Sequence, residues 1–207
     1  MPLYGSDKKR RWKRKDTNFA ARKLAVFKEG GGAMRMVRFG GAMSLDGYIA
    51  APDGGYDWIV QDPEMSFAEM MAPFDTFLIG RKTFETMARA GQAKASPPGI
   101  QYVIVSRTIQ PDDYPQFTVR SNGADAVCEL RTKPGKDIAL FGGGELFRSL
   151  LSAGMVDRIE VSVIPVLLGG GVPVLPSPAD RARLKLLNQR SYSKTGIVRL
   201  EYEILHN

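Results

Sequence analysis

Two short apolar runs in this sequence break on glycine and then continue as the start of a helix. The first run is followed by Gly80-Arg81-Lys82-Thr83, and the second by Gly142-Gly143-Gly144-Glu145-Leu146. A helix that begins at such a junction presents unpaired backbone N–H groups and a partial positive charge, which together favour phosphate. Two such helix starts in one domain predict a ligand with more than one phosphate, such as a dinucleotide.

The two glycine junctions differ in how strongly they indicate binding. Gly80 has no Cβ and so lets its backbone approach a phosphate, Thr83 can donate a hydrogen bond, and Arg81 and Lys82 supply charge. A glycine that simply caps a helix is the alternative at this junction. Three consecutive glycines cost conformational entropy, which a fold tolerates where the backbone is strained or closely approached. The triplet is therefore the stronger indication.

A third polar segment, Ser106-Arg107-Thr108, follows the apolar run from Tyr102 to Val105. Its hydroxyls and guanidinium suit the 2′-phosphate that separates NADP from NAD. An ordinary surface turn is the alternative.

The elements around these segments predict how they are positioned. We expect strands at Val37 to Ala42, Tyr48 to Ala50, Phe74 to Ile79, Tyr102 to Val105, Asp137 to Phe141, Arg158 to Val166, Leu184 to Ser191 and Ile197 to Leu205. We expect helices at Pro63 to Ala72, from Arg81, at Ala124 to Leu130 and at Glu145 to Leu151. This order predicts a three-layer α/β fold with a mostly parallel central sheet and an antiparallel C-terminal edge. Because ligands of such sheets bind at the carboxyl ends of strands, all three polar segments fall where a ligand is expected.

Composition excludes several classes of function. Cys128 is the only cysteine and His206 the only histidine, so we expect no disulfide, no Cys/His metal site and no hydrolysis with a histidine base. The uncharged stretch from Val161 to Ala179 contains four prolines and three consecutive glycines, which argues against a membrane helix. No secretory signal is evident, and we expect a soluble cytoplasmic protein.

The positive charge of the chain is confined to one end. Residues 1–35 hold eleven basic and three acidic residues, so the rest of this chain of net charge +7 carries −1. We therefore expect a basic disordered tail over residues 1–35 and one folded domain over residues 36–207. Nucleic-acid binding is expected only if the tail provides it, and a solvated tail is the favoured interpretation.

Three motifs in this order, IGRKTFE, VSRT and FGGGELF, resemble the nicotinamide-binding signatures of the dihydrofolate reductase superfamily. AMSLDGYIA at residues 42–50, YDWI at 56–59 and IPVLLGGGVPVL at 164–175 are similar to the branch that includes the RibD C-terminal reductase domain of riboflavin biosynthesis. The resemblance runs from about Met36 to the C-terminus. It implies a dihydrofolate reductase-like fold and reduction of a planar heterocycle, as in 5-amino-6-(5-phosphoribosylamino)uracil reductase and dihydrofolate reductase.

The resemblance also implies a cofactor, NADPH, and the residues that hold it. They are Ala42, Ser44, Trp58, Gly80, Arg81, Lys82, Thr83, Ser106, Arg107, Gly142, Gly143, Gly144, Glu145 and Leu146. A cis peptide bond is implied at Gly142-Gly143 or Gly143-Gly144. Two departures concern the substrate: GRKTFETM replaces the substrate motif of the riboflavin-pathway enzymes, and Phe141 stands where they have an acid.

Reduction of a ring by a dihydrofolate-type enzyme needs a carboxyl group to deliver a proton beside the carbon that receives hydride. Asp57, Asp62, Glu64 and Glu69 are the nearby acids, and we select Asp57 and Glu69, together with Asp46 in the SLDG segment. Each has a plain alternative, because Asp57 and Glu69 suit a solvated surface and an Asp-Gly pair forms a turn.

A second class of function stays open: a protein that binds a nucleotide or folate-like ligand without turnover. We expect a small heterocyclic substrate, and we expect a homodimer in which apolar residues of the late strands, such as Val161, Val163 and Val166, pair between copies.

Overall fold

The computed structural model describes residues 34–206, so most of the predicted tail lies outside the described residues. Arg35, which was assigned to the tail, belongs to the folded part. Its side chain is buried, forms an ion pair with Asp75 and donates to Thr76 Oγ1 over 2.7 Å. A buried charge needs such partners, and these contacts hold Arg35 against β3.

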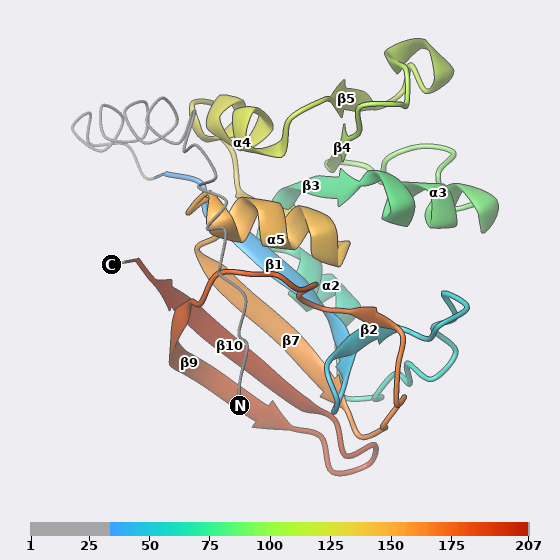
Figure 1. The fold of residues 1–207 in the computed structure, drawn as a ribbon, viewed down its shortest axis with the longest axis vertical. Coiled ribbons are helices and arrows are strands. Elements are labelled where there is room, and N and C mark those ends of the chain that lie inside the picture. The colour runs from blue at the N-terminus through green and yellow to red at the C-terminus, as the bar shows by residue number, and fades with distance from the viewer. Residues whose placement is uncertain (1–33, 207) are drawn as a thin grey trace, which may run out of the picture.

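An eight-stranded sheet organises the chain, in the order β5-β4-β3-β6-β1-β7-β10-β9 (Figure 1). Its strands are β1 (Val37–Ser44), β3 (Phe74–Gly80), β4 (Gln101–Val105), β5 (Thr118–Arg120), β6 (Asp137–Leu140), β7 (Arg158–Ile164), β9 (Arg183–Ser191) and β10 (Val198–Leu205). All neighbours from β5 to β7 are parallel, and β10 is antiparallel to both β7 and β9. The predicted α/β architecture with an antiparallel C-terminal edge is confirmed.

Helices cover both faces of the parallel part. They are α2 (Phe67–Met71), α3 (Arg81–Arg89), α4 (Gly123–Arg131) and α5 (Gly144–Ser152), with a 3₁₀ turn, η1, at Pro111–Asp113. Alternate residues of β3 point to opposite faces, so Leu78 packs in one core with α4 and α5, while Ile79 packs in another with Phe84 of α3. Burial on both faces explains why β3 reads as a continuous apolar run.

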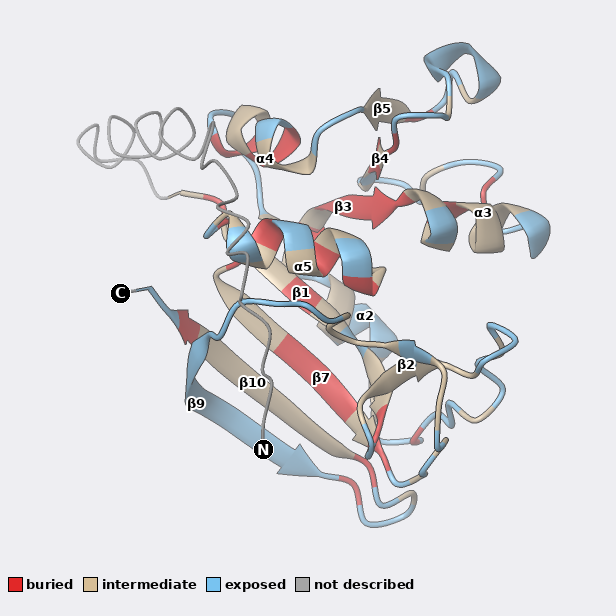
Figure 2. Cartoon of the chain, viewed as in Figure 1, coloured by how far each residue is buried: buried red, intermediate tan, exposed pale blue. Residues whose placement is uncertain are grey.

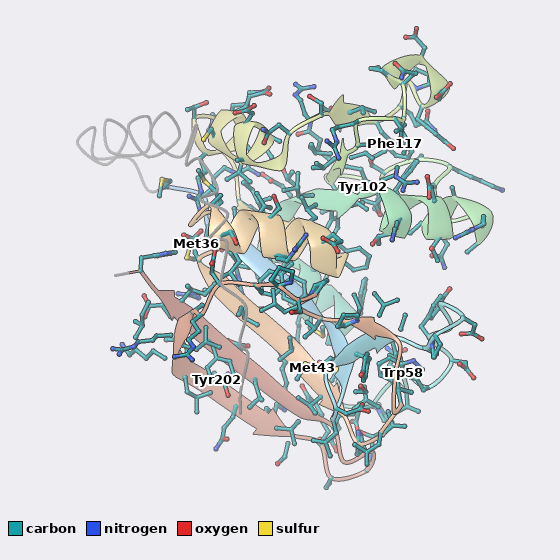
Figure 3. All side chains as sticks on the ribbon, in the orientation of Figure 1. Met36, Met43, Trp58, Tyr102, Phe117 and Tyr202 are labelled. Atoms are coloured by element: carbon teal, nitrogen blue, oxygen red, sulfur yellow. The ribbon has the colours of Figure 1, made fainter. Side chains whose placement is uncertain are left out.

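The second core extends to the end of the sheet through aromatic contacts. Tyr102 of β4 stacks on Phe117 with ring centroids 5.7 Å apart (Figure 3). Phe84 meets the same Phe117 ring edge-on at 5.5 Å. These contacts attach α3 and the segment before β5 to the edge of the sheet where Ser106 and Arg107 lie.

Local structure differs from the sequence prediction in three places. The helix expected over residues 63–72 is restricted to Phe67–Met71, because the Asp62 carboxylate accepts the Glu64 N–H in a turn and Ser66 caps the helix. Two very short strands, β5 and β8 (Val172–Pro173), were missed, and β8 pairs with the predicted β2 (Tyr48–Ala50).

No helix within residues 34–206 is long and apolar enough to cross a membrane.

The structure does not favour a dimer contact by pairing of β7, although Val163 and Val166 are only partly buried. Val161 is buried, and β7 is paired on both sides, by β1 and β10, so it has no free edge. The exposed strand is β9, whose nine residues are all exposed at the end of the sheet (Figure 2).

Candidate active site

Three strand ends that are far apart in the sequence meet at one edge of the sheet. β4, β3 and β6 are neighbours and parallel, so Ser106, Gly80 and the glycine triplet follow carboxyl ends that lie side by side. The Gly80 N–H donates to the Gly142 carbonyl oxygen over 3.0 Å. The two glycine junctions are therefore in direct contact, at the edge of the sheet where a ligand is expected.

The backbone is closely approached at the meeting point of these junctions. A Cβ on Gly80 would lie 3.3 Å from Gly143 N and 3.4 Å from Gly142 O, and Gly142 has a φ of +78°. The Thr83 hydroxyl faces both Gly142 and Gly143, since a Cβ on either would lie 3.3 Å from Thr83 Oγ1. The Gly142-Gly143 peptide is cis, the first of the two bonds expected.

Both helices at this edge begin without a side-chain cap. The cap positions of α3 and α5 are Gly80 and Gly143, and neither offers a side chain to the first N–H groups. Glu145 lies exposed in the first turn of α5 and pairs with Arg148, whereas Leu146 packs against the core. Backbone N–H groups and a helix dipole without a competing cap suit an anionic group.

The cationic side chains at this edge differ in whether they form an ion pair. The Arg81 guanidinium pairs with Glu85 over 2.7 Å, whereas Lys82 and Arg107 are exposed and have no ion pair with any described residue. Ser106 is buried, and its Oγ accepts the N–H groups of Thr108 and Ile109. Ser106 therefore shapes the turn that presents Arg107.

Arg120, at the end of the missed strand β5, is a further cation at this edge. It forms a two-point ion pair with Glu129, at 2.9 and 3.1 Å. Hydrogen bonds from Arg120 and Lys133 lower the pKa of Glu129 to about 2. The charge of Arg120 is thus shared with Glu129. Among residues 34–206, Arg107 and Lys82 are left as the cations of this edge without an ion pair. The run Arg120-Ser121-Asn122-Gly123 before a helix was the signal in the sequence.

The loop after β1 is built around Asp46. Its carboxylate accepts the Ser44 hydroxyl over 2.6 Å and the N–H groups of Leu168 and Gly169. These bonds, that of Ser44 foremost, hold the pKa of Asp46 below its usual value. Such a carboxylate is suited to accepting hydrogen bonds, while a proton donor at neutral pH needs a raised pKa.

Ala42 and Trp58 lie in one apolar cluster with Ile164, Tyr192 and Ile197. The indole N–H of Trp58 donates to the Gly55 carbonyl over 3.3 Å, which fixes the ring within its loop. Asp57, beside it, is exposed. The structure thus brings two of the predicted cofactor residues together next to β1.

A cavity of about 180 Å³ lies between the α2 segment and the outer strands β9 and β10. Glu69 lines it with Glu64, Met65, Ser66, Met70, Asn188, Arg190, Tyr192, Arg199 and Glu201. Met65 and Tyr192 also belong to the cluster that holds Ala42 and Trp58, so cavity and cluster are continuous. β10, which lines the cavity, lies three strands from β6, which leads into the glycine triplet. At normal strand spacing the two strands are roughly 14 Å apart.

Asp62 is the buried acid of this region. Burial raises the pKa of its carboxyl group, but hydrogen bonds from the Glu64 N–H and the Thr195 hydroxyl outweigh burial and leave the pKa below its usual value. Asp62 therefore ties the hairpin between β9 and β10 to the α2 segment. Within residues 34–206 no group of three or more His, Cys, Asp or Glu side chains could hold a metal ion.

The family model of the RibD C-terminal domain matches residues 35–198, almost the whole described fold. The chain belongs to this family. Its curated relatives include YyaP of Bacillus subtilis (strain 168), which is 32% identical over 171 residues, covering 78% of this chain and 90% of YyaP. The family assignment agrees with the resemblance expected from the three motifs.

Solved structures share the fold of this family member. A diaminohydroxyphosphoribosylaminopyrimidine deaminase/5-amino-6-(5-phosphoribosylamino)uracil reductase from Thermotoga maritima has a TM-score of 0.64 at 14% identity, over 89% of this chain and 60% of that one. Dihydrofolate reductase from Enterococcus faecalis, complexed with NADP(H), has a TM-score of 0.58 at 16% identity, over 83% and 97% of the two chains. The dihydrofolate reductase-like fold is therefore confirmed.

Proposed function

We propose that this protein is an NADPH-dependent reductase of a planar heterocycle. Membership in the RibD C-terminal domain family and a dihydrofolate reductase-like fold support an oxidoreductase. One observation carries the cofactor part of the proposal: two uncapped helix starts join through the 3.0 Å bond between Gly80 and Gly142. Arg107, which has no ion pair with any residue from 34 to 206, follows the neighbouring strand β4. A pyrophosphate and a 2′-phosphate are the groups that such a site would bind.

Each part of the site has a separate role in this proposal. The backbone of Gly142, Gly143 and Gly144 with the first turn of α5 binds the pyrophosphate, and Thr83 donates its hydroxyl. Lys82, Ser106 and Arg107 bind the adenosine end, with Arg107 selecting the 2′-phosphate. Ala42, Ser44 and Trp58 line the nicotinamide side. When bound, NADPH supplies the hydride, and the protein supplies its orientation.

Glu69 is the proposed proton donor, because it is the only one of the three selected acids that lines the cavity. Glu69 and Asp57 are both exposed, but Asp57 does not line the cavity, and Asp46 already accepts hydrogen bonds from three donors. We expect Glu69→Gln to lower kcat about a hundredfold, the usual contribution of a general acid. Glu64→Gln is the matched control, since Glu64 lines the same cavity. Equal losses in both variants would reject Glu69 as the donor.

The proposed substrates are a pyrimidine or a folate-like ring. The direct test is NADPH oxidation, followed at 340 nm, with 5-amino-6-(5-phosphoribosylamino)uracil or dihydrofolate. Steady oxidation that depends on either compound supports the reductase. NADPH binding without oxidation by either would favour the alternative, a ligand-binding protein without turnover.

A homodimer through β9 is a separate proposal. β9 has a free edge, and the side chains of Leu184 and Leu186 are 42% and 47% exposed. Both lie opposite apolar residues of β10, Ile204 and Tyr202, so they extend the apolar face of the sheet beyond the core. A long exposed edge strand with an apolar face favours pairing with a second copy.

A further inference from the structure

Residues 166–176, here called the strap, connect the loop after β1 to the glycine triplet. The strap leaves β7, passes through β8 and ends near the start of α5 (Figure 1). The strap contains no reactive side chain. Its apolar and glycine residues have no role in the site predicted from the sequence. Its contacts at both ends assign one.

The loop after β1 holds the strap at three points. Leu45 N donates to the Val166 carbonyl over 2.9 Å, and Val174 N donates to the Gly47 carbonyl over 2.9 Å. Between them, the Asp46 carboxylate accepts Leu168 N at 3.1 Å and Gly169 N at 2.7 Å. Asp46 is the only side chain among these contacts, because the other two bonds join backbone to backbone.

The far end of the strap packs directly on the glycine triplet. A Cβ on Gly144 would lie 2.6 Å from the Pro173 carbonyl oxygen and 3.0 Å from the Val174 carbonyl oxygen. The Val174 N–H thus donates to the loop after β1, and the Val174 carbonyl packs against Gly144, the first residue of α5. Displacement of the strap must therefore disturb both the loop after β1 and the start of α5.

The Asp46 side chain is itself fixed from below. Ser44 is completely buried, and its hydroxyl donates to Asp46 Oδ1 while accepting the Tyr48 N–H over 2.9 Å. Gly47 and Gly169 next to the contact have positive φ angles, of 88° and 69°, which place the two turns face to face. The Asp46 carboxylate is therefore held towards the N–H groups of Leu168 and Gly169 in the strap.

We infer that Asp46 is a positioning residue that clamps the strap and thereby couples the loop after β1 to the glycine triplet. The coupling rests on the proposed function only where it concerns NADPH; the clamp itself does not. Loosening at Asp46 moves Leu168 and Gly169 first and the start of α5 second. A ligand on the glycine triplet tightens the strap in return, because coupling between two sites is reciprocal.

Hydrogen–deuterium exchange on the full chain tests both halves of this inference. In Asp46→Asn, we expect peptides covering residues 166–171 and 143–147 to exchange about fivefold faster or more, the lower end of usual coupling between sites. Asp53→Asn is the matched control, since its carboxylate accepts only Gly55 N in an exposed turn. Ser44→Ala, which removes the hydroxyl partner of Asp46, should loosen the same two peptides.

Melting temperatures identify a variant that fails to fold, and Ser44→Ala then carries the test. Unchanged exchange at residues 166–171 in folded Asp46→Asn overturns the clamp. Faster exchange there with unchanged exchange at 143–147 overturns the coupling. Both readouts are made without cofactor, so they stand even if the protein does not bind NADPH.

NADPH gives a further readout that a purely structural role would not produce. In the unmodified protein, saturating NADPH should slow exchange at residues 166–171, and in Asp46→Asn its dissociation constant should rise about fivefold. An equal dissociation constant in both proteins overturns the coupling. Absence of NADPH binding in both overturns the proposed function instead.

Discussion

Gly80→Ala isolates the close approach between the two glycine junctions. Gly80 has φ −73° and ψ 153°, which alanine adopts without strain, so any destabilisation of the folded state comes from the added methyl group. That Cβ would lie 3.3 Å from Gly143 N, 3.4 Å from Gly142 O and 3.5 Å from Leu146 Cβ. The first two neighbours are backbone, so the start of α5 must shift by a few tenths of an ångström.

The expected magnitudes separate stability from binding. Crowding of this kind costs about 1–3 kcal/mol, and loss of the glycine's freedom in the unfolded chain returns about 0.4–1 kcal/mol. The net loss, about 1 kcal/mol, lowers the melting temperature by about 2–4 °C. The same shift displaces the N–H groups that are proposed to bind the pyrophosphate, so we expect NADPH to bind about tenfold more weakly, which is about 1.4 kcal/mol.

Fluorescence titration with NADPH and thermal melting measure the two effects. Gly170→Ala is the control, because a Cβ there meets nothing within 4 Å and the residue has no positive φ. NADPH affinity that is unchanged in Gly80→Ala would refute the reasoning that the junction is the cofactor site. Equal weakening in Gly170→Ala would refute the steric explanation.

Three further predictions concern separate contacts. Arg107→Ala should weaken NADPH by about 1–3 kcal/mol and leave NADH unchanged in titrations, because it removes a charged contact to the 2′-phosphate alone; equal losses for both would contradict its role. Glu129→Gln should destabilise the protein by about 1 kcal/mol at neutral pH, since the pair with Arg120 is about 40% exposed. Because the pKa of Glu129 is depressed, the ion pair stabilises the protein at pH values above 4.5, the usual pKa of the group, and this stabilisation is lost as the pH falls towards about 2. The free energies of unfolding of the two proteins, measured with denaturant, should therefore converge near pH 2. A difference that persists at pH 2 would reject the pair as the cause. Leu186→Glu should convert a dimer into a monomer in light scattering, whereas a wild-type monomer would reject the β9 interface.

Strong local signals made the central part of the fold predictable. The buried run of β3 and the glycine that ends it, at Gly80, can be recognised from residue type alone. The same holds for the triplet at Gly142 and for the order of strands and helices, which implies a common edge. Their direct contact, through Gly80 N and Gly142 O, depends in addition on the pairing of β3 with β6, which the order along the chain does not specify.

Features that depend on distant partners were not predictable. β5 and β8 are three and two residues long, too short for a periodic pattern, and both exist because a neighbouring strand pairs with them. Arg35 looked like part of a basic tail because its partner, Asp75, is forty positions away. Asp46 was expected near the reacting atoms, and its hydrogen bonds to the strap, 122 and 123 positions along the chain, could not be inferred from an Asp-Gly pair.

The edge formed by Gly80, Arg107 and Gly142 is proposed to bind a dinucleotide that carries a 2′-phosphate. Parallel titrations of the unmodified protein with NADPH and NADH measure whether it does. We predict that NADPH binds at least about tenfold more tightly than NADH. No binding of NADPH, or equal binding of the two, would contradict the claim.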